Sequence, residues 1–189
     1  LWEKAAISAC VVAVLFSFLG FAGPCEEIPE KVLRLHVLAN SDTEEDQALK
    51  YKVRDQVLKT GTGLLDEANT REEAQNILAN HLEELEAAAM SVVAEEGFTY
   101  PVTAELTEMY FATRQYENVT LPAGNYEALR ITIGSGEGHN WWCVMFPPLC
   151  LPAAEGAAEL EDVLTTSETE LVTGGYEIKF KAVEWVEGI

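Results

Sequence analysis

A histidine close to a cysteine is the arrangement in this sequence that most directly suggests covalent chemistry. His139 lies four residues before Cys143, and a histidine near a thiol can take its proton and leave a nucleophilic thiolate. The i, i+4 spacing would bring the two side chains together on a helix, but on a strand they would lie about 13 Å apart. The spacing therefore does not favour a catalytic dyad, and we predict no catalytic residue.

A disulfide between Cys143 and Cys150 is the alternative that we favour for the same cysteine. The other two cysteines, Cys10 and Cys25, lie in or just beyond an apolar N-terminal run, so this pair is the one within the body of the chain. Outside the cytoplasm such a pair can oxidise, and closing so short a loop contributes about 2.5 kcal/mol before strain. Free structural thiols and a reactive Cys143 remain the other two interpretations.

Metal and cofactor sites find little support in the sequence. The three histidines do not form an H-E-x-x-H motif, and no C-x-x-C occurs. The glycines at 134, 136 and 138 match neither a P-loop nor a dinucleotide-binding pattern, so we interpret them as turn residues. We predict no metal and no cofactor.

The N-terminal segment from Ala5 to Gly23 carries no charged side chain and is rich in valine, leucine and phenylalanine. Its length lies between that of a signal peptide and that of a membrane anchor, and either would export the rest of the chain. A buried core helix would also be apolar all round, but the terminal position beside Lys4 argues against it. We expect residues 1–23 to be a signal peptide or anchor and residues 24–189 to be a single extracytoplasmic domain.

The formal net charge of −20 restricts the partners of this domain. Nucleic acid and anionic membrane surfaces would repel it, although such acidity can also be no more than a well-solvated surface. We therefore expect no nucleic-acid partner, and contact with a membrane only through the N-terminal segment if that segment is not cleaved.

The first half of the domain reads as one strand followed by two helices. Alternating apolar residues predict a strand over 31–39. Ser41 and Glu44 have the spacing of a capping box, which predicts a helix to about Lys59, ended by the glycines at 61 and 63. A second capping box at Thr70 and Glu73 predicts one long helix as far as Glu96.

The second half reads as several strands. Alternation predicts strands over Val102–Phe111, Tyr126–Ile133 and Trp142–Phe146, the last two as antiparallel neighbours joined by the glycine-rich turn. A short helix near 157–164 and a final element over 176–187 complete the pattern. The order predicts an α+β fold, a mainly antiparallel sheet with two or three helices packed on it, preceded by the apolar export helix.

Two sequence blocks carry a resemblance to a known family. The first block is L-R-L-H-V-L-A-N-S-D over residues 33–42, continued by E-D-Q-A-L-K and K-V-R-D as far as residue 55. The second joins P-A-G at 122–124 and Y-E-A-L-R at 126–130 to G-H-N-W-W-C-V-M-F-P-P-L-C at 138–150. The sequence resembles the stage II sporulation protein R family of endospore-forming bacteria.

The resemblance implies a function that composition and spacing do not show. Members of this family are forespore signalling proteins, exported into the space between the two sporulation membranes. There they trigger the membrane-embedded protease that matures sigma-E, so the implied partner is the precursor of that protease. Two alternatives from other classes are an exported cysteine-dependent hydrolase of cell-wall peptides and a wall-associated structural protein.

The expected contact surface for such a partner combines polar and aromatic residues next to loops. Trp141 and Trp142 would face opposite ways on a strand, so one of them could contact a partner or be covered by a helix. Ser41 and Asp42 could equally serve only as helix caps. The predicted partner-binding residues are Arg34, Asn40, Ser41, Asp42, His139, Asn140, Trp141 and Trp142.

Overall fold

The computed structural model describes residues 27–116, 119–148 and 164–173, together with isolated positions between residues 2 and 12. The apolar segment Ala5 to Gly23, the short helix expected near 157–164 and the element expected over 176–187 lie outside these residues, apart from isolated positions. No helix within the described part is long and apolar enough to cross a membrane.

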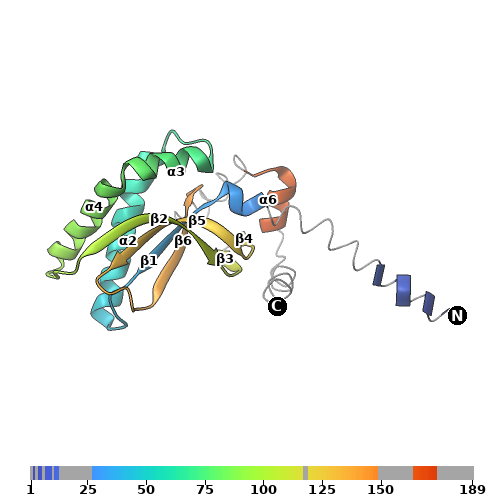
Figure 1. Cartoon of the computed structure of the whole chain (residues 1–189), viewed down its shortest axis with the longest axis horizontal. Helices are drawn as coiled ribbons and strands as arrows, with labels where there is room; N and C mark the ends of the chain where they lie inside the picture. The colour runs from blue at the N-terminus through green and yellow to red at the C-terminus, as the bar shows by residue number, and fades with distance from the viewer. Residues whose placement is uncertain are drawn as a thin grey trace.

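A four-stranded sheet forms the centre of the fold, in the order β2-β5-β1-β6 (Figure 1). The strands are β1 (Leu33–Leu38), β2 (Val102–Phe111), β5 (Gly124–Ile133) and β6 (Asn140–Phe146). β2 is antiparallel to β5 and β6 is antiparallel to β1, but β1 and β5 are parallel. The α+β class is confirmed, with a mixed sheet in which antiparallel pairs predominate.

The expectation that β5 and β6 are neighbours is wrong, because β1 lies between them. The glycine-rich turn that joins them passes over the end of β1 and is bonded to the residues just after that strand. The amide of Gly138 donates to the carbonyl of Ala39 at 3.0 Å, and that of Glu137 donates to the carbonyl of Asn40 at 3.3 Å. β1 is buried on both of its faces, which is typical of a central strand.

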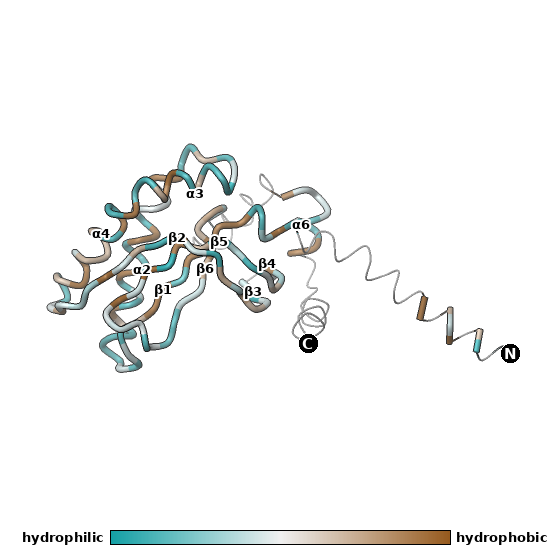
Figure 2. Tube along the Cα trace, viewed as in Figure 1, coloured by the Kyte–Doolittle hydropathy of each residue, from teal (hydrophilic) through white to brown (hydrophobic). Residues whose placement is uncertain are grey.

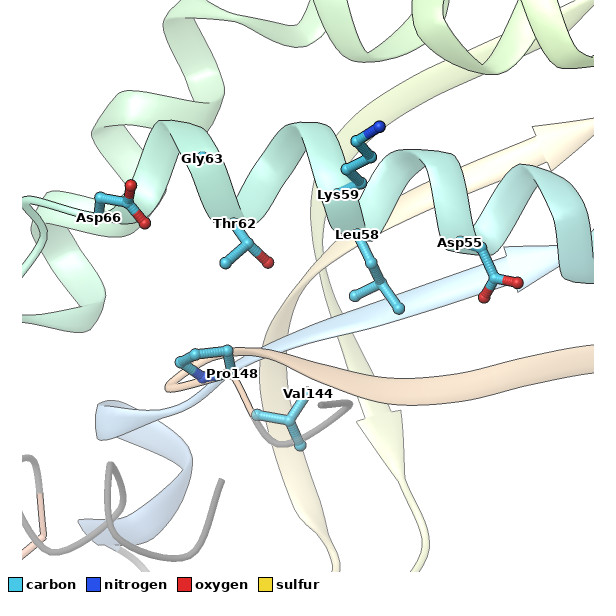
Figure 3. A pocket seen from close by; sticks show the side chains of 8 residues that line it. All are labelled: Asp55, Leu58, Lys59, Thr62, Gly63, Asp66, Val144 and Pro148. Carbon is cyan, nitrogen blue, oxygen red and sulfur yellow. The ribbon is translucent and has the colours of Figure 1, made fainter. Parts of the chain in front are cut away.

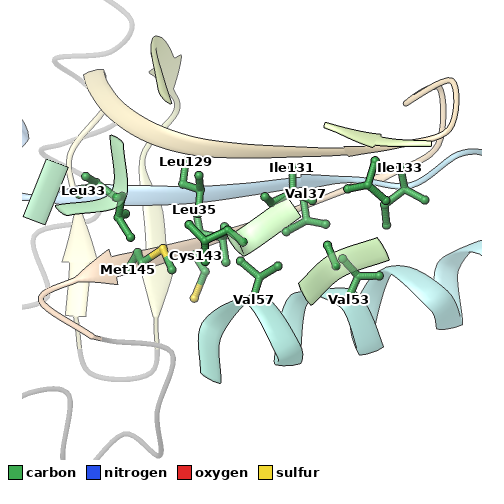
Figure 4. Packing of buried hydrophobic residues seen from close by; sticks show 14 of the residues in the cluster. Leu33, Leu35, Val37, Val53, Val57, Leu129, Ile131, Ile133, Cys143 and Met145 are labelled. Carbon is green, nitrogen blue, oxygen red and sulfur yellow. The ribbon is translucent and has the colours of Figure 1, made fainter. Parts of the chain in front are cut away.

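Three helices cover one face of the sheet: α2 (Glu44–Leu65), α3 (Arg71–Asn80) and α4 (Leu82–Glu95) (Figure 1). Hydrophobic and hydrophilic residues alternate along α3 and α4, as expected of helices with one buried side (Figure 2). The layer between sheet and helices is filled by aliphatic side chains (Figure 4), among them Leu33, Leu35, Val37, Val53, Val57, Leu129, Ile131, Ile133 and Met145.

The N-cap residue of α2 lies two positions after the predicted one, Ser41. Thr43 is the N-cap, and its hydroxyl accepts a hydrogen bond from the amide of Asp46 at 3.3 Å. The predicted capping box of Ser41 and Glu44 does not form, because the Ser41 hydroxyl donates to the Asp46 carboxylate at 2.6 Å instead. Ser41 is thus committed to the loop and not to the helix end.

Helix α2 also runs past both glycines that were expected to end it. Gly61 is buried against β6, and a Cβ placed on it would overlap the terminal methyl of Met145. A Cβ on Gly63 would meet nothing within 4 Å. The sequence shows the low helix propensity of glycine but not the close approach of a strand, so the prediction that Gly61 ends the helix is wrong.

The predicted long helix from Thr70 to Glu96 is two helices. Thr70 caps α3 as expected, accepting from the amide of Glu73 at 3.2 Å. The chain then breaks at His81, whose φ of −122° and ψ of 17° are not helical. Gly97, with a φ of +82°, follows the end of α4 as predicted.

The second face of the sheet is covered by smaller elements: β3 (Arg114–Tyr116), β4 (Val119–Leu121), α6 (Thr166–Thr173) and a helical turn over 27–31. They enclose a separate apolar cluster that includes Ile28, Val32, Phe111, Leu121, Tyr126, Val144, Leu171 and Val172. Strand β1 therefore lies between two cores, one on each side of the sheet.

Candidate docking surface

The loop after β1 meets the loop before β6 at one end of the sheet, and we call this region the corner: Asn40, Ser41, Asp42, His139 and Asn140. The Asn40 side-chain oxygen accepts from the amide of Ser135 at 3.0 Å, and its amide group donates to Asp46 at 2.8 Å. Asn40 thus ties the glycine-rich turn to the start of α2. Residues that are far apart in the sequence form one hydrogen-bonded surface here.

Asp42 and His139 make the exposed contact of the corner. The Asp42 carboxylate accepts from the His139 amide at 2.6 Å and lies 2.5 Å from the imidazole Nδ1. These two hydrogen bonds, the one from the amide first, hold the pKa of Asp42 below its usual value. The two side chains are 54% and 81% exposed, so solvent screens the pair and it contributes little to folding.

Lys50 supports the corner from beneath, a role that its place in the sequence did not suggest. It is almost fully buried, and its ammonium donates to the backbone carbonyl of His139 at 3.0 Å and to Gln47 at 2.6 Å. Burial is the main cause that lowers the pKa of Lys50, and the nearby charge of Arg54 adds to it. The sequence places Lys50 inside the helix predicted after Ser41 and gives no sign of this contact.

Gly138 allows the two loops of the corner to touch. A Cβ at this position would overlap the backbone carbonyl of Ser41. The glycine was expected as a turn residue, but the structure shows that its small size is what matters here. Any larger residue would push the His139 loop away from the loop that carries Asp42.

The two tryptophans face opposite sides of the sheet, as predicted, and both are half-buried. Trp141 lies on the helix side, where its ring meets the edge of Tyr51 with centroids 5.5 Å apart. The Arg54 guanidinium lies 4.5 Å from the same indole ring. Tyr51 is 40% exposed, so an aromatic and cationic patch continues from the corner along α2.

Trp142 lies on the second face and is held there by its neighbours. It stacks on His36 at 4.0 Å and meets Phe111 edge to face at 4.7 Å. Its indole N–H donates to the side chain of Asn140 at 2.6 Å. Trp142 therefore joins the corner to the second face, but it is not a freely exposed ring.

Arg34 does not lie on this surface, contrary to expectation. It is fully buried, stacked on Phe111 at 4.2 Å and Tyr126 at 4.9 Å, and it donates to the Tyr116 hydroxyl at 2.5 Å. Its remaining guanidinium nitrogens have no hydrogen-bond partner within the described part of the chain. An arginine on a strand is ordinarily assigned to the surface, whereas here the aromatic rings cover it.

Cys143 is buried on the helix side and takes part in a disulfide. Its partner lies outside the described residues, as does Cys150, so the Cys143–Cys150 pairing stays a prediction. His139 directs its ring at Asp42, and no group of three histidine, cysteine or acidic residues in the described segments could hold a metal ion.

Comparison with known proteins assigns the chain to a family. The profile of the stage II sporulation protein R family matches residues 29–155. The chain is also 37% identical to the stage II sporulation protein R of Bacillus subtilis (strain 168), over 86% of this chain and 83% of the relative. No solved structure matches it. These matches place the chain among sporulation proteins, in a family that is not a known enzyme family. The chain belongs to the stage II sporulation protein R family.

Proposed function

We propose that this protein is an exported signalling protein of endospore formation. In this proposal it acts in the space between forespore and mother cell, where it docks on the extracytoplasmic part of the membrane-embedded protease precursor that matures sigma-E. Family membership supports the sporulation role, and the apolar segment from Ala5 to Gly23 supports export. The protein would activate its partner by binding the active state better than the inactive one, so no covalent chemistry is required.

The corner carries the docking part of this proposal. Its exposed pair, Asp42 and His139, sits on backbone that is fixed from below by Lys50 and Asn40. A polar surface held rigid before binding loses little conformational entropy when a partner arrives. The half-buried rings of Trp141 and Trp142 flank it, and large aromatic residues are enriched where partners bind.

A reconstituted system tests the proposal. The full chain is co-expressed with the protease precursor and the sigma precursor in a non-sporulating host, and maturation of sigma-E is measured. Wild type should produce maturation, and Asp42→Ala and Trp142→Ala should each lower it about tenfold or more at equal protein abundance. Glu105→Ala, which breaks an exposed ion pair with Arg130 outside the corner, is the matched control and should signal normally.

Normal signalling from both corner variants would refute the surface, and no maturation with wild type would refute the function. Cys143→Ser distinguishes the signalling function from the cysteine-dependent hydrolase. Loss of activity with normal folding and secretion, together with enhancement of the wild type by reductant, would favour an enzyme.

A further inference from the structure

Strand β6 is an edge of the sheet. It pairs with β1 on one side, and on its other side no strand of the described segments pairs with it. An edge strand presents backbone N–H and C=O groups to which another extended chain can bond, whatever its sequence. The opposite edge, β2, has the same property, so the edge alone does not identify a binding site.

A groove along α2 distinguishes the β6 edge. A cavity of about 520 Å³ lies between the outer side of α2 and the end of β6 (Figure 3). Leu58 and Thr62 point from α2 towards Pro148 and Val144 on the other wall. Gly63 also lines the cavity and has open space around its Cα, so the groove has room for a side chain from a bound segment.

One end of the groove carries an acidic side chain that has no ion-pair partner among the described residues. Lys59 also lines the cavity, but its side chain points away from Pro148 on the other wall (Figure 3). Asp66 caps the C-terminal end of α2, where the helix dipole is already negative, and the last turn of α2 contains no basic residue. Asp66 is exposed and makes no ion pair with any described residue, whereas Asp55 at the other end is paired with Arg54 at 2.6 Å. The Asp66 end of the groove therefore favours a lysine or arginine, and the net charge of −20 adds to that preference.

The groove is continuous with the corner. β6 begins at Asn140, which belongs to the corner, and runs along α2 to the cavity. Between them lies the patch formed by Tyr51, Arg54 and Trp141. A partner that contacts Asp42 and His139 could thus extend one of its segments along the whole outer edge of β6.

We propose that the outer edge of β6 and the adjoining groove of α2 bind an extended segment of the docking partner as an added strand, with an apolar side chain at Leu58 and a lysine or arginine at Asp66. This inference rests on the proposed function for the identity of the partner. The binding chemistry itself, backbone pairing plus one apolar and one basic side chain, can be measured without that partner.

Gly63 provides the sharpest test. Gly63→Trp places a large ring in the groove, and Gly63→Ala is the matched control because its methyl group meets nothing within 4 Å. The probe is a fluorescently labelled peptide of alternating valine and lysine, with a valine–glutamate peptide as comparison. The full chain should bind the lysine peptide, Gly63→Ala should bind it equally, and Gly63→Trp should weaken binding about tenfold or more.

Asp66→Lys keeps the test decisive if Gly63→Trp fails to fold. It should abolish the preference for the lysine peptide, while Glu67→Lys, the same charge change one residue further on, should reduce it less. Equal binding of both peptides by wild type, or unchanged binding by Gly63→Trp and Asp66→Lys, overturns the groove. If wild type forms a dimer in solution and Gly63→Trp is a monomer, the groove is a self-interface and the proposal is also overturned.

The same variants in the maturation assay separate the two proposals. If Gly63→Trp signals normally while Asp42→Ala does not, the groove is not the docking site although the proposed function stands. If wild type fails to mature sigma-E, the proposed function fails, and the peptide titration still decides whether the groove binds an extended basic segment.

Discussion

Strand β1 has two different faces. Its helix-covered face is packed by aliphatic side chains, whereas its second face buries two titratable side chains. Leu33, Leu35 and Val37 point to the first, and Arg34 and His36 point to the second. On the second face aromatic rings cover these two side chains within a cluster that also contains aliphatic residues: Phe111 lies against Arg34 and Trp142 stacks on His36. One strand thus obtains burial on its first face from hydrophobic area, and on its second face at the cost of desolvating polar groups.

Adjacent substitutions in β1 offer the strongest challenge to that comparison. Leu35→Ala should lower the free energy of unfolding by about 2–5 kcal/mol, because Leu35 is fully buried between the sheet and the helices. Arg34→Met should change it by about 1 kcal/mol or less, since it relieves the burial of a charge that faces no carboxylate among the described residues. Urea unfolding of both variants measures the difference. A larger loss from Arg34→Met than from Leu35→Ala would contradict the contrast between the faces.

The pH dependence of stability provides a second challenge, specific to the second face. Burial, and then the charge of Arg130, lowers the pKa of His36 from 6.5 to about 4. The folded state therefore binds fewer protons than the unfolded state between these values, and stability falls as the pH falls from about 6.5 to about 4. The contribution of His36 over this window is about 3 kcal/mol, and it is constant above pH 6.5.

The measurement is the free energy of unfolding of wild type and His36→Phe at several pH values. The phenyl ring keeps the stacking on Trp142 and removes the titration, so the wild-type slope should exceed that of the variant. Equal slopes for wild type and His36→Phe would show that His36 is not buried neutral.

Substitutions of the two glycines of α2 test how tightly the helix-covered face is packed, and their expected effects on the free energy of unfolding are the smallest. Gly61→Ala should cost about 1–3 kcal/mol, because its methyl group would overlap the buried side chain of Met145. Gly63→Ala should stabilise the protein by about 0.5–1 kcal/mol through helix propensity alone. Thermal melting of the two variants should shift in opposite directions. A stabilising Gly61→Ala would mean that the helix face is loosely packed.

The sequence was sufficient to predict those parts of the fold that depend on local pattern. β2 has the bounds that alternation predicts, and Thr70 caps a helix as the S/T-x-x-E spacing requires. The insertion of β1 between β5 and β6 could not be predicted, because it depends on bonds between the turn at 134–138 and the residues after β1. The break at His81 could not be predicted either, because no glycine or proline lies at that position.

The site was predictable to a similar degree. The sequence grouped Asn40, Ser41 and Asp42 with His139, and the structure places these residues together. The sequence could not show that Lys50 lies beneath them. Lys50 is bonded to the His139 carbonyl, a tertiary contact that no repeat in the sequence indicates. Arg34 was assigned to the surface for the opposite reason: aromatic residues far along the chain cover it.

The central position of β1 also sets the order of events in time. Its partners in the sheet, such as Leu129 and Cys143 beside Leu35, are made long after β1 itself. Synthesis proceeds from the N-terminus, and non-local strand pairing is slow, so the nascent chain cannot close its sheet until β6 has been made. For a protein that we propose to be exported, this delay keeps the chain unfolded while it is being made, and leaves folding to the compartment in which the signal is read.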